Sequence, residues 1–391
     1  MTYFHWIAGS ILALAWVSRV IGAARGMPKI PDVSQPEWDR NPVRPSGNPR
    51  VSIVVPARDE EQDIEQSLTR LLALDYGNYE VIAVDDRSTD RTGERMDGIA
   101  ATPQAHGRLK VIHIDALPAG WLGKTHAMWT AAQQATGDWL LFTDADVLFQ
   151  PASLRRALAY AETEPADHLV LFPRFSMKSP GEKMMIAFFQ TLFVFGHRPW
   201  KVAEPDTDDH MGVGAFNLIR RRVYEAVGTY KALRFEVLDD MKLGKVVKQA
   251  GYAQRNVFGA DLISIRWAKG TLGVVRNLTK NGFAVMSFQW PRTVLSCVAL
   301  LFLNLWPFAG VWLSHGWARL PYALALLSIF FIYFGMSRRS SVEPYYFALH
   351  PVSTLVFTST LLGSMVLAFW RGGVVWRGTM YPLEELKKGL V

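Results

Sequence analysis

Residues 51–61 of the chain are VSIVVPARDEE, and residues 79–86 are YEVIAVDD. Each stretch starts with apolar, β-favouring residues and ends in charged ones, a pattern typical of a strand buried on both faces. The expected strands are 51–55, 79–86, 109–115 and 138–146. Helix-like stretches at 60–74, from residue 90 and at 124–136 lie between them. Alternating strands and helices predict an α/β domain with a mostly parallel sheet and helices on both faces.

The composition of the 391 residues excludes several classes of protein. With 50% hydrophobic residues the chain is not disordered, and Cys297 alone cannot build a disulfide scaffold. The net charge of +7 is unevenly spread: residues 25–261 contain 29 basic and 32 acidic side chains, whereas residues 262–391 contain 12 and 3. The basic third also holds most of the long apolar runs, so its charge favours a membrane surface and argues against nucleic acid as a partner.

Four apolar runs approach the ~20 residues that a helix needs to cross a bilayer. They are 3–24, 294–314, 320–336 and 351–370. The first has no Lys or Arg before it, and basic residues only at or after its end, which predicts an uncleaved anchor whose C-terminal side is cytoplasmic. We expect a multi-pass protein of the inner or plasma membrane with a cytoplasmic catalytic domain. The run at 320–336 can instead be a buried or re-entrant helix, which leaves the number of crossings open.

These patterns predict six consecutive parts of the chain. They are an anchor (1–25), a Pro-rich linker (26–49), a catalytic domain (50–261), a basic amphipathic segment (262–293), about three transmembrane helices (294–372) and a tail (373–391). The amphipathic segment is expected to lie in the membrane surface, and a basic linker packed on the soluble domain is the alternative. The apolar stretch 184–200 is either a core helix or a further membrane-dipping element.

Acidic residues follow three of the expected strands. They are Asp59, Glu60 and Glu61, then Asp85 and Asp86, then Asp144 and Asp146. Carboxylates at one edge of a sheet repel one another, and a divalent cation bound together with a phosphorylated ligand removes that repulsion. The sequence therefore predicts Mg²⁺ or Mn²⁺, although an Asp-x-Asp triplet by itself is also common in surface turns.

Taken in order, six motifs between about Arg50 and Trp267 resemble glycosyltransferase family 2, the inverting enzymes with a GT-A nucleotide-sugar fold. The motifs are VSIVVPARDEE, VIAVDDRSTDRT, GWLGK, FTDADV, GVGAFNLIRR and LDDMKLGKVVKQAGY. The PARDEE start, with one N-terminal and several C-terminal apolar runs, is similar to the subgroup associated with hopanoid and carotenoid glycosylation.

The resemblance implies a set of donor-site residues. The first nucleotide loop is Pro56, Ala57, Arg58, Asp59 and Glu60. Asp85 and Asp86 contact base and ribose, and Ser88 and Asp90 complete the turn that follows them. Lys124 reaches the phosphates or the sugar, while Asp144 and Asp146 bind the metal, Asp146 more directly. Many members have an aromatic residue at the position of Arg58, and a guanidinium can also stack on a base. Capping of the next helix is the alternative role of Ser88 and Asp90.

The resemblance also implies catalytic and acceptor-side residues. Asp240 is the expected general base with Asp239 as its neighbour, and the acceptor side is expected to contain Gly212, Gly214, Ala215, Arg266 and Trp267. Two acids at a helix N-terminus can also simply stabilise that helix. Processive members carry Gln-x-x-Arg-Trp, but here residue 263 is Ile, which argues against a polymer synthase.

The expected reaction is metal-dependent transfer of a sugar, with inversion, from a UDP- or GDP-linked donor to a lipid hydroxyl of polyisoprenoid, hopanoid or carotenoid-like type. A processive polysaccharide synthase is the first alternative. A non-catalytic membrane scaffold that binds nucleotide sugar or lipid is the second.

Overall fold

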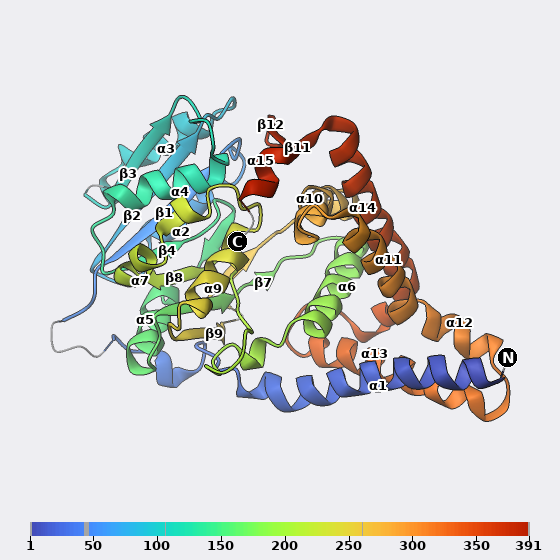
Figure 1. Ribbon diagram of the computed structural model, residues 1–391. Helices are drawn as coiled ribbons and strands as arrows, with labels where there is room; N and C mark the ends of the chain where they lie inside the picture. The colour runs from blue at the N-terminus through green and yellow to red at the C-terminus, as the bar shows by residue number, and fades with distance from the viewer. Residues whose placement is uncertain (1, 43–46, 106, 260, 390–391) are drawn as a thin grey trace. The chain divides into compact units, whose positions relative to one another are not determined.

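The computed structural model describes residues 2–42, 47–105, 107–259 and 261–389, and the chain divides into two compact units (Figure 1). Unit 1 contains Met1–Lys29, Phe175–Trp200 and Trp267–Trp376. Unit 2 contains Ile30–Arg174, Lys201–Arg266 and Arg377–Val391. Each unit is thus assembled from three separate stretches of the chain. The boundaries of the units therefore differ from those of the six consecutive parts that were expected from the sequence.

Unit 2 is built on a seven-stranded sheet in the described part of the chain. Its order is β3 (Leu109–Ile114), β2 (Tyr79–Asp86), β1 (Val51–Ala57), β4 (Trp139–Phe142), β8 (Asn217–Arg220), β6 (His168–Phe172) and β9 (Gln254–Phe258). The first four strands are parallel, and β8 is antiparallel to both β4 and β6. The predicted α/β domain with a mostly parallel sheet is confirmed, with β8 as the reversed strand.

The register of the sheet brings the charged strand ends together. Val51 lies opposite Tyr79 and Ala57 lies opposite Asp85, so β1 and β2 end at the same level. The loop after β1 and the acidic end of β2 therefore share one edge of the sheet, where open α/β sheets bind ligands.

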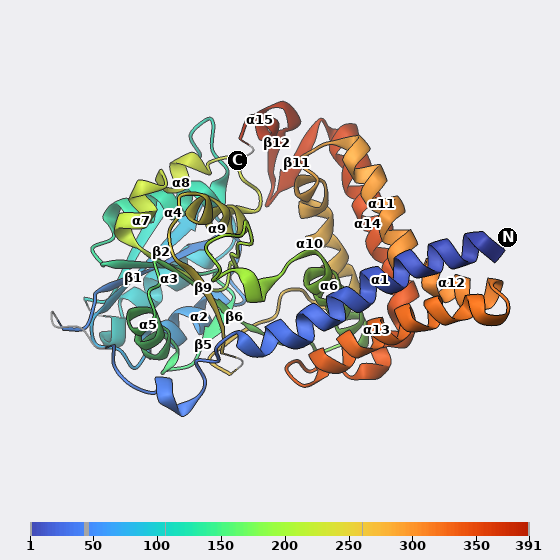
Figure 2. The same cartoon turned by 60° about the horizontal axis from the view of Figure 1, so that its bottom comes forward.

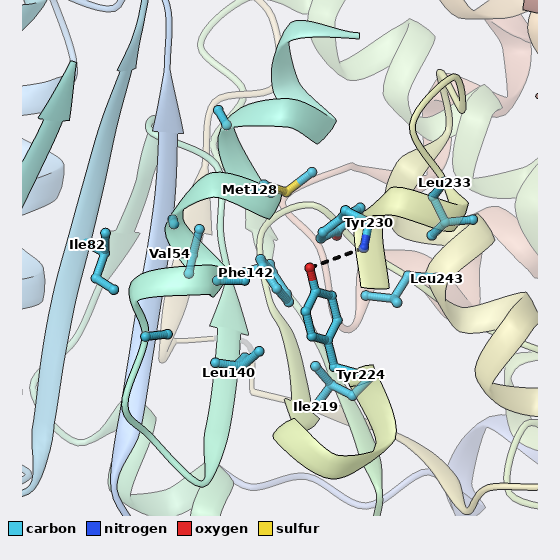
Figure 3. Close-up of a cluster of buried hydrophobic side chains, with 14 of the residues drawn as sticks. Val54, Ile82, Met128, Leu140, Phe142, Ile219, Tyr224, Tyr230, Leu233 and Leu243 are labelled. Carbon is cyan, nitrogen blue, oxygen red and sulfur yellow. Dashed lines mark hydrogen bonds between the residues drawn. The ribbon is translucent and has the colours of Figure 1, made fainter. Parts of the chain in front are cut away.

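Helices pack on the sheet and bury it. They are α2 (Ile64–Leu72), α3 (Thr92–Ala100), α4 (Gly123–Gln134), α5 (Ser153–Thr163), α7 (Arg221–Ala226), α8 (Thr229–Ala232) and α9 (Asp239–Gln249). Every residue of β1 and β4 is buried, as strands covered on both faces require. On one face Val54, Leu140 and Phe142 pack against Met128 of α4 and Leu243 of α9 (Figure 3). This core fixes the N-termini of α4 and α9 over the ends of the strands.

Unit 1 is helical. Its helices are α1 (Thr2–Gly26), α6 (Pro180–Gly196), α10 (Gly270–Val285), α11 (Trp290–Asn304), α12 (Trp306–Leu313), α13 (Leu320–Ser337) and α14 (His350–Arg371), followed by β11 (Gly373–Trp376). Helices α1 and α13 lie side by side, and α10 packs against α14 and α6 (Figures 1 and 2).

Three segments of unit 1 are long and apolar enough to cross a membrane. They are Thr2–Lys29, Gly316–Ser337 and Pro344–Arg371, and α11 with α12 forms a further candidate bent by 48°, all within the described residues. Large apolar side chains such as Leu14, Leu295 and Trp370 are exposed on these helices. Membrane helices expose such surface to lipid, whereas soluble domains bury it. The predicted N- and C-terminal helices with this character are therefore present.

Most of the two segments expected as linker and tail belongs to unit 2. Asp32 forms a bridge with Phe258 of β9, and the carboxylate of Asp39 contacts Arg155 and Arg156 at 2.6 Å each. The tail contains β12 (Thr379–Pro382) and α15 (Leu383–Lys388). Conversely, α6 belongs to unit 1 although it lies within the expected catalytic domain, because its apolar side chains pack on α10, α13 and α14.

Candidate active site

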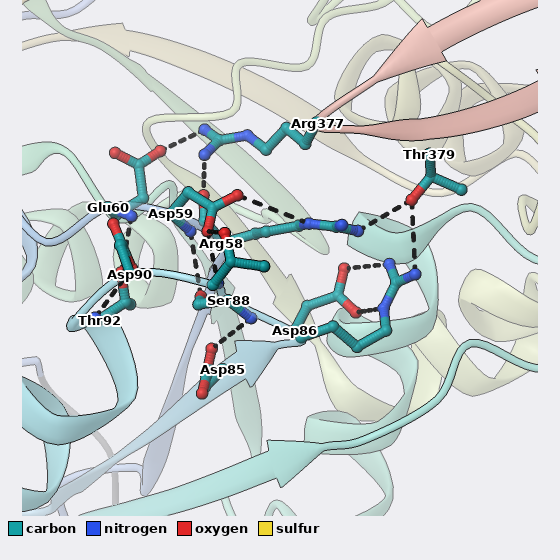
Figure 4. Close-up of polar contacts among 12 residues, drawn as sticks. Arg58, Asp59, Glu60, Asp85, Asp86, Ser88, Asp90, Thr92, Arg377 and Thr379 are labelled. Carbon is teal, nitrogen blue, oxygen red and sulfur yellow. Dashed lines mark hydrogen bonds and ion pairs between the residues drawn. The ribbon is translucent and has the colours of Figure 1, made fainter.

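The loops after β1 and β2 hold each other in place. Asp59 has a φ of 53° and Arg87 a φ of 56°, so both loops turn through the left-handed region that non-glycine residues rarely adopt. The backbone N–H of Asp59 donates to the Ser88 hydroxyl at 3.0 Å, and the N–H of Thr89 donates to the Asp59 carboxylate at 2.7 Å (Figure 4). Of the predicted nucleotide loop, Pro56 and Ala57 are buried residues of β1, and the fixed turn begins directly after them at Arg58.

The acidic pair that ends β2 has two different environments. Asp85 accepts from the Ser88 N–H at 3.1 Å and contacts His113 Nδ1 at 3.1 Å. Asp86 is buried and forms a two-bonded ion pair with Arg87 at 2.7 and 2.9 Å. A Cβ at Gly123 would lie 2.2 Å from an oxygen of Asp86, so only glycine lets α4 begin this close to the carboxylate.

The turn after β2 continues into α3 through Asp90. Its carboxylate accepts from the backbone N–H of Thr92 at 2.9 Å and from the Thr92 hydroxyl at 2.5 Å. It also accepts from the N–H of Glu61 at 3.2 Å, which ties the first loop to the second. Asp90 therefore has a structural role in this turn.

Lys124, in the first turn of α4, joins carboxylates from two other elements. Its ammonium lies 2.8 Å from Asp144 Oδ1 and 3.3 Å from Asp239 Oδ1. Burial alone lowers the pKa of Lys124, but the charges of Asp144, Asp239 and Asp240 outweigh it and the net pKa is raised. The sequence marked each of these residues separately, and the structure brings them together around one permanently charged ammonium.

Asp146 lies among other carboxylates after β4. Burial, followed by the charges of Asp144 and Glu60, raises the pKa of Asp146 to about 7. Burial likewise raises the pKa of Glu60, against the opposing charge of Arg377. An excess of buried negative charge is the environment that a divalent cation stabilises.

The carboxylates of Asp144 and Asp146 fit a metal that is shared with a ligand. Within the described ranges, no group of three or more His, Cys, Asp or Glu side chains is arranged to hold a metal by protein atoms alone. Mg²⁺ commonly binds through one or two carboxylates and completes its shell with phosphate oxygens and waters. Asp144 and Asp146 would hold such an ion from the protein side.

The loop of residues 212–215, here called the glycine loop, contacts two carboxylate residues. They are Asp144, which follows β4, and Asp240, which lies in α9. The N–H of Gly214 donates to Asp240 Oδ2 at 2.7 Å, and the N–H of Asp144 donates to the Gly214 carbonyl at 2.9 Å. A Cβ at Gly214 would lie 2.4 Å from Asp144 Oδ2, and one at Gly212 would lie 1.8 Å from the backbone oxygen of Asp240. The Ala215 carbonyl accepts from the Thr143 hydroxyl at 2.8 Å. Close approach thus explains both glycines.

The carboxylates at the start of α9 have raised pKa values. Burial raises the pKa of Asp239 to about 7, with Lys124 opposing and Asp240 adding to the shift. The pKa of Asp240 is also raised, first by burial, while Lys124 and the N–H groups of Met241 and Gly214 lower it. Burial is thus the main cause of the raised pKa of Asp240. A carboxylate of raised pKa at a helix N-terminus can serve both as a base and as a helix-stabilising charge.

Two predicted acceptor-side residues are adjacent in the sequence but belong to different units. Arg266 is the last residue of its stretch in unit 2 and follows β10 (Ile263–Ile265), which pairs with β5 (Val147–Phe149). Trp267 belongs to unit 1, where its ring stacks on Phe189 with a centroid distance of 5.2 Å.

Four residues at this edge of the sheet were not predicted. They are Arg87, Arg377, Thr379 and Tyr381. The Thr379 hydroxyl accepts from Arg58 at 3.0 Å and from Arg87 at 3.5 Å (Figure 4). The Tyr381 hydroxyl accepts from the N–H of Gly123 at 3.1 Å. The available signal was the cluster of polar and basic residues that follows the last apolar run.

The sequence matches one family model, glycosyl transferase family 2, over residues 52–228. The chain contains a family 2 glycosyltransferase domain. The matched range contains both strand-end loops, Lys124, Asp144, Asp146 and the glycine loop, and it ends before α9. Of the carboxylates of this enzyme that contact Lys124, Asp144 lies inside the matched range and Asp239 lies outside it.

Named relatives and a solved structure support this assignment. The chain is 22% identical over 267 residues to 4,4'-diaponeurosporenoate glycosyltransferase of Staphylococcus haemolyticus, and this alignment covers 68% of the chain and 69% of the relative. It is 33% identical over 165 residues to beta-monoglucosyldiacylglycerol synthase of Synechocystis sp., and this alignment covers 41% of the chain and 33% of the relative. A mannosyltransferase from Pyrobaculum calidifontis in complex with GDP-Man and Mn2+ aligns over 94% of this chain and 99% of its own, with a TM-score of 0.55 and 18% identity. The mixed α/β core is thus shared with GT-A glycosyltransferases.

Proposed function

We propose that this glycosyltransferase transfers a sugar from a UDP- or GDP-linked donor to the hydroxyl of a lipid, with inversion at the anomeric carbon. The observation that carries the proposal is the convergence of Lys124, Asp144 and Asp239 at 2.8–3.3 Å, with Asp240 bound to the same glycine loop. The ammonium of Lys124, which can stabilise a diphosphate, thereby lies near carboxylates that can accept the proton of a hydroxyl. Group transfer to an alcohol requires both functions close together.

The chain's own residues divide the work of the reaction. Asp240 accepts the proton of the acceptor hydroxyl while that oxygen attacks the anomeric carbon and the diphosphate departs from the opposite side. The raised pKa of Asp240 improves it as a proton acceptor. Lys124 presents its ammonium to the departing diphosphate. A divalent cation held by Asp144 and Asp146 would neutralise further charge on that leaving group.

The donor's nucleotide is proposed to bind at the ends of β1 and β2. In this arrangement Pro56, Ala57, Arg58 and Glu60 surround it, and Asp85 and Asp86 contact base and ribose. The turn is rigid, because Asp59 and Ser88 bind across it. A rigid site lowers the entropy cost of donor binding. The solved neighbour that contains GDP-Man and Mn2+ makes GDP-mannose with Mn²⁺ a first choice for assay.

The acceptor is proposed to be a lipid, taken from a membrane in which this enzyme is embedded by several helices with unit 2 in the cytoplasm. The apolar helices of unit 1 support this. So do the two relatives, which are named as a diaponeurosporenoate glycosyltransferase and a monoglucosyldiacylglycerol synthase. The loop with Gly212, Gly214 and Ala215, together with Arg266 of the same unit, is proposed to form the acceptor side. The stretches 1–25 and 294–372 would supply the anchor and the membrane helices, and 262–293 would lie along the surface.

The test is transfer by purified full-length protein in nanodiscs, with a panel of UDP- and GDP-sugars and a lipid extract, analysed by mass spectrometry. We expect a lipid product of one added sugar in the wild type and none in Asp240→Asn, while donor binding survives. Glu225→Gln, an exposed acid on α7, is the matched control. Full turnover by folded Asp240→Asn removes Asp240 from the mechanism, a long polymer favours a polysaccharide synthase, and binding without turnover in the wild type favours a scaffold.

A further inference from the structure

The stretch 377–388, here called the C-terminal strap, is an integral part of unit 2. It comprises β12 and α15, and its side chains Leu383 and Leu386 are buried. A Cβ added to Gly389, directly after the strap, would lie 2.2 Å from Phe235, which shows how closely the chain is packed there. A segment that is anchored at its C-terminal end in this way can hold its first residues in a defined position.

Those first residues lie on the loops that the proposed function gives to the nucleotide. The guanidinium of Arg377 donates to the carbonyl oxygen of Arg58 and pairs with Glu60 (Figure 4). Two residues later, Thr379 accepts from the guanidiniums of both Arg58 and Arg87. Consecutive contacts thus reach the loop after β1 and the loop after β2.

The arrangement concentrates positive charge at the carboxyl end of the sheet. Arg58 and Arg87 share one hydroxyl oxygen, and Arg377 lies against the same loop. Like charges held this close repel each other, and part of this repulsion is offset by Asp59, Asp86 and Glu60, which pair with Arg58, Arg87 and Arg377 respectively. A guanidinium binds phosphate oxygens with two parallel hydrogen bonds, so an anionic ligand would relieve the repulsion.

The backbone supports a functional interpretation of this contact. Among the described residues, six non-glycine residues have a positive φ, and three of them, Asp59, Arg87 and Arg377, meet here. Left-handed conformations of such residues cost free energy and concentrate at ligand-binding sites. Three of them at one junction indicate that the side chains are held where a ligand needs them.

Resting on the proposed function, we propose that the strap forms one wall of the donor site. Arg377 binds the diphosphate of the nucleotide sugar, and Thr379 is a positioning residue that orients Arg58 and Arg87 toward the nucleotide. The ion pair of Arg377 with Glu60 holds the guanidinium of Arg377 at the loop that the proposed function gives to the nucleotide.

The experiment measures binding of UDP, GDP and the corresponding nucleosides to full-length protein in nanodiscs by calorimetry, alongside donor KM, kcat and the unfolding temperature. Arg377→Ala should weaken nucleoside diphosphate binding about tenfold to a hundredfold, the loss expected for a hydrogen bond to a charged group, and leave nucleoside binding unchanged. Arg377→Lys should recover part of the affinity. Thr379→Val should raise donor KM more than it lowers kcat.

Lys387→Ala is the matched control, because Lys387 lies on the same strap and pairs with Glu384 at 3.1 Å. It should bind nucleotide as the wild type does. Wild-type diphosphate affinity in both Arg377→Ala and Thr379→Val overturns the inference, as does a loss of affinity that only parallels a fall in unfolding temperature and is not recovered by Arg377→Lys. If the wild type binds neither UDP nor GDP, the proposed function itself fails.

Discussion

Replacing Gly214 by alanine is the sharpest perturbation of the proposed metal site. The new Cβ would lie 2.4 Å from Asp144 Oδ2 and 3.2 Å from its carboxyl carbon. Ordinary contacts between non-bonded heavy atoms are near 3.5 Å, so the carboxylate must move by roughly 1 Å. The φ of Gly214 is not positive, so alanine can adopt the same backbone conformation.

A shift of that size should reduce transfer strongly and leave the fold intact. A displacement of about 1 Å in a catalytic constellation typically costs about a hundredfold in rate, which corresponds to about 2.7 kcal/mol in the activation barrier. The shift also separates Asp144 from Lys124, whose ammonium lies 2.8 Å away. We expect a lower kcat and a requirement for more Mg²⁺ or Mn²⁺ at half-maximal rate.

The assay is the initial rate of sugar transfer across a metal titration, with unfolding temperature measured on the same preparations. Gly77→Ala is the matched control, because a Cβ there meets nothing within 4 Å and the residue is exposed. Wild-type rate and wild-type metal dependence in Gly214→Ala would refute the assignment of Asp144 to the metal site.

Three further predictions follow from the same geometry. Lys124→Met should abolish transfer, because it removes the ammonium from Asp144 and Asp239, and wild-type transfer rates would contradict its role at the diphosphate. EDTA should stop transfer and added Mn²⁺ or Mg²⁺ should restore it, and activity that persists in EDTA would exclude the metal. Burial lowers the pKa of His168 to about 4, so the unfolded chain binds a proton before the folded chain does as the pH falls. The contribution of His168 to the free energy of unfolding should therefore decline between about pH 6.5 and pH 4, by up to about 1.4 kcal/mol per pH unit. Denaturant unfolding at pH 7 and pH 5 checks this, and His168→Gln should flatten the slope; an equal slope in both proteins would exclude His168 as its source.

Much of the donor edge could be predicted from the sequence because parallel βα units repeat a simple geometry. Apolar runs locate the strands, and residues directly after a strand lie at one edge of the sheet. This reasoning placed Asp86 and Asp144 at the carboxyl ends of β2 and β4, where the structure has them. The antiparallel β8 was not visible in the pattern, because a buried strand has the same composition in either direction.

Contacts between distant residues could not be predicted in the same way. Thr379 and Arg58 are separated by 321 residues, and no local periodicity records which loop a distant segment covers. The apolar stretch that became α6 has a composition suited to a protein core or a membrane, so the sequence left both open. Likewise, an acidic pair at a helix start did not reveal that burial dominates the pKa of Asp240.

The interleaving of the two units has a consequence for biosynthesis. Translation proceeds from the N-terminus, so Arg377–Val391 leaves the ribosome only after Trp267–Trp376 has been synthesised. The contacts of Arg377 and Thr379 with the nucleotide loop therefore form last, when the apolar helices have already been made. An interrupted polypeptide that stops before residue 377 carries the carboxylates proposed to be catalytic but lacks these contacts. The order of synthesis thus delays completion of the donor edge until the helical unit has been made.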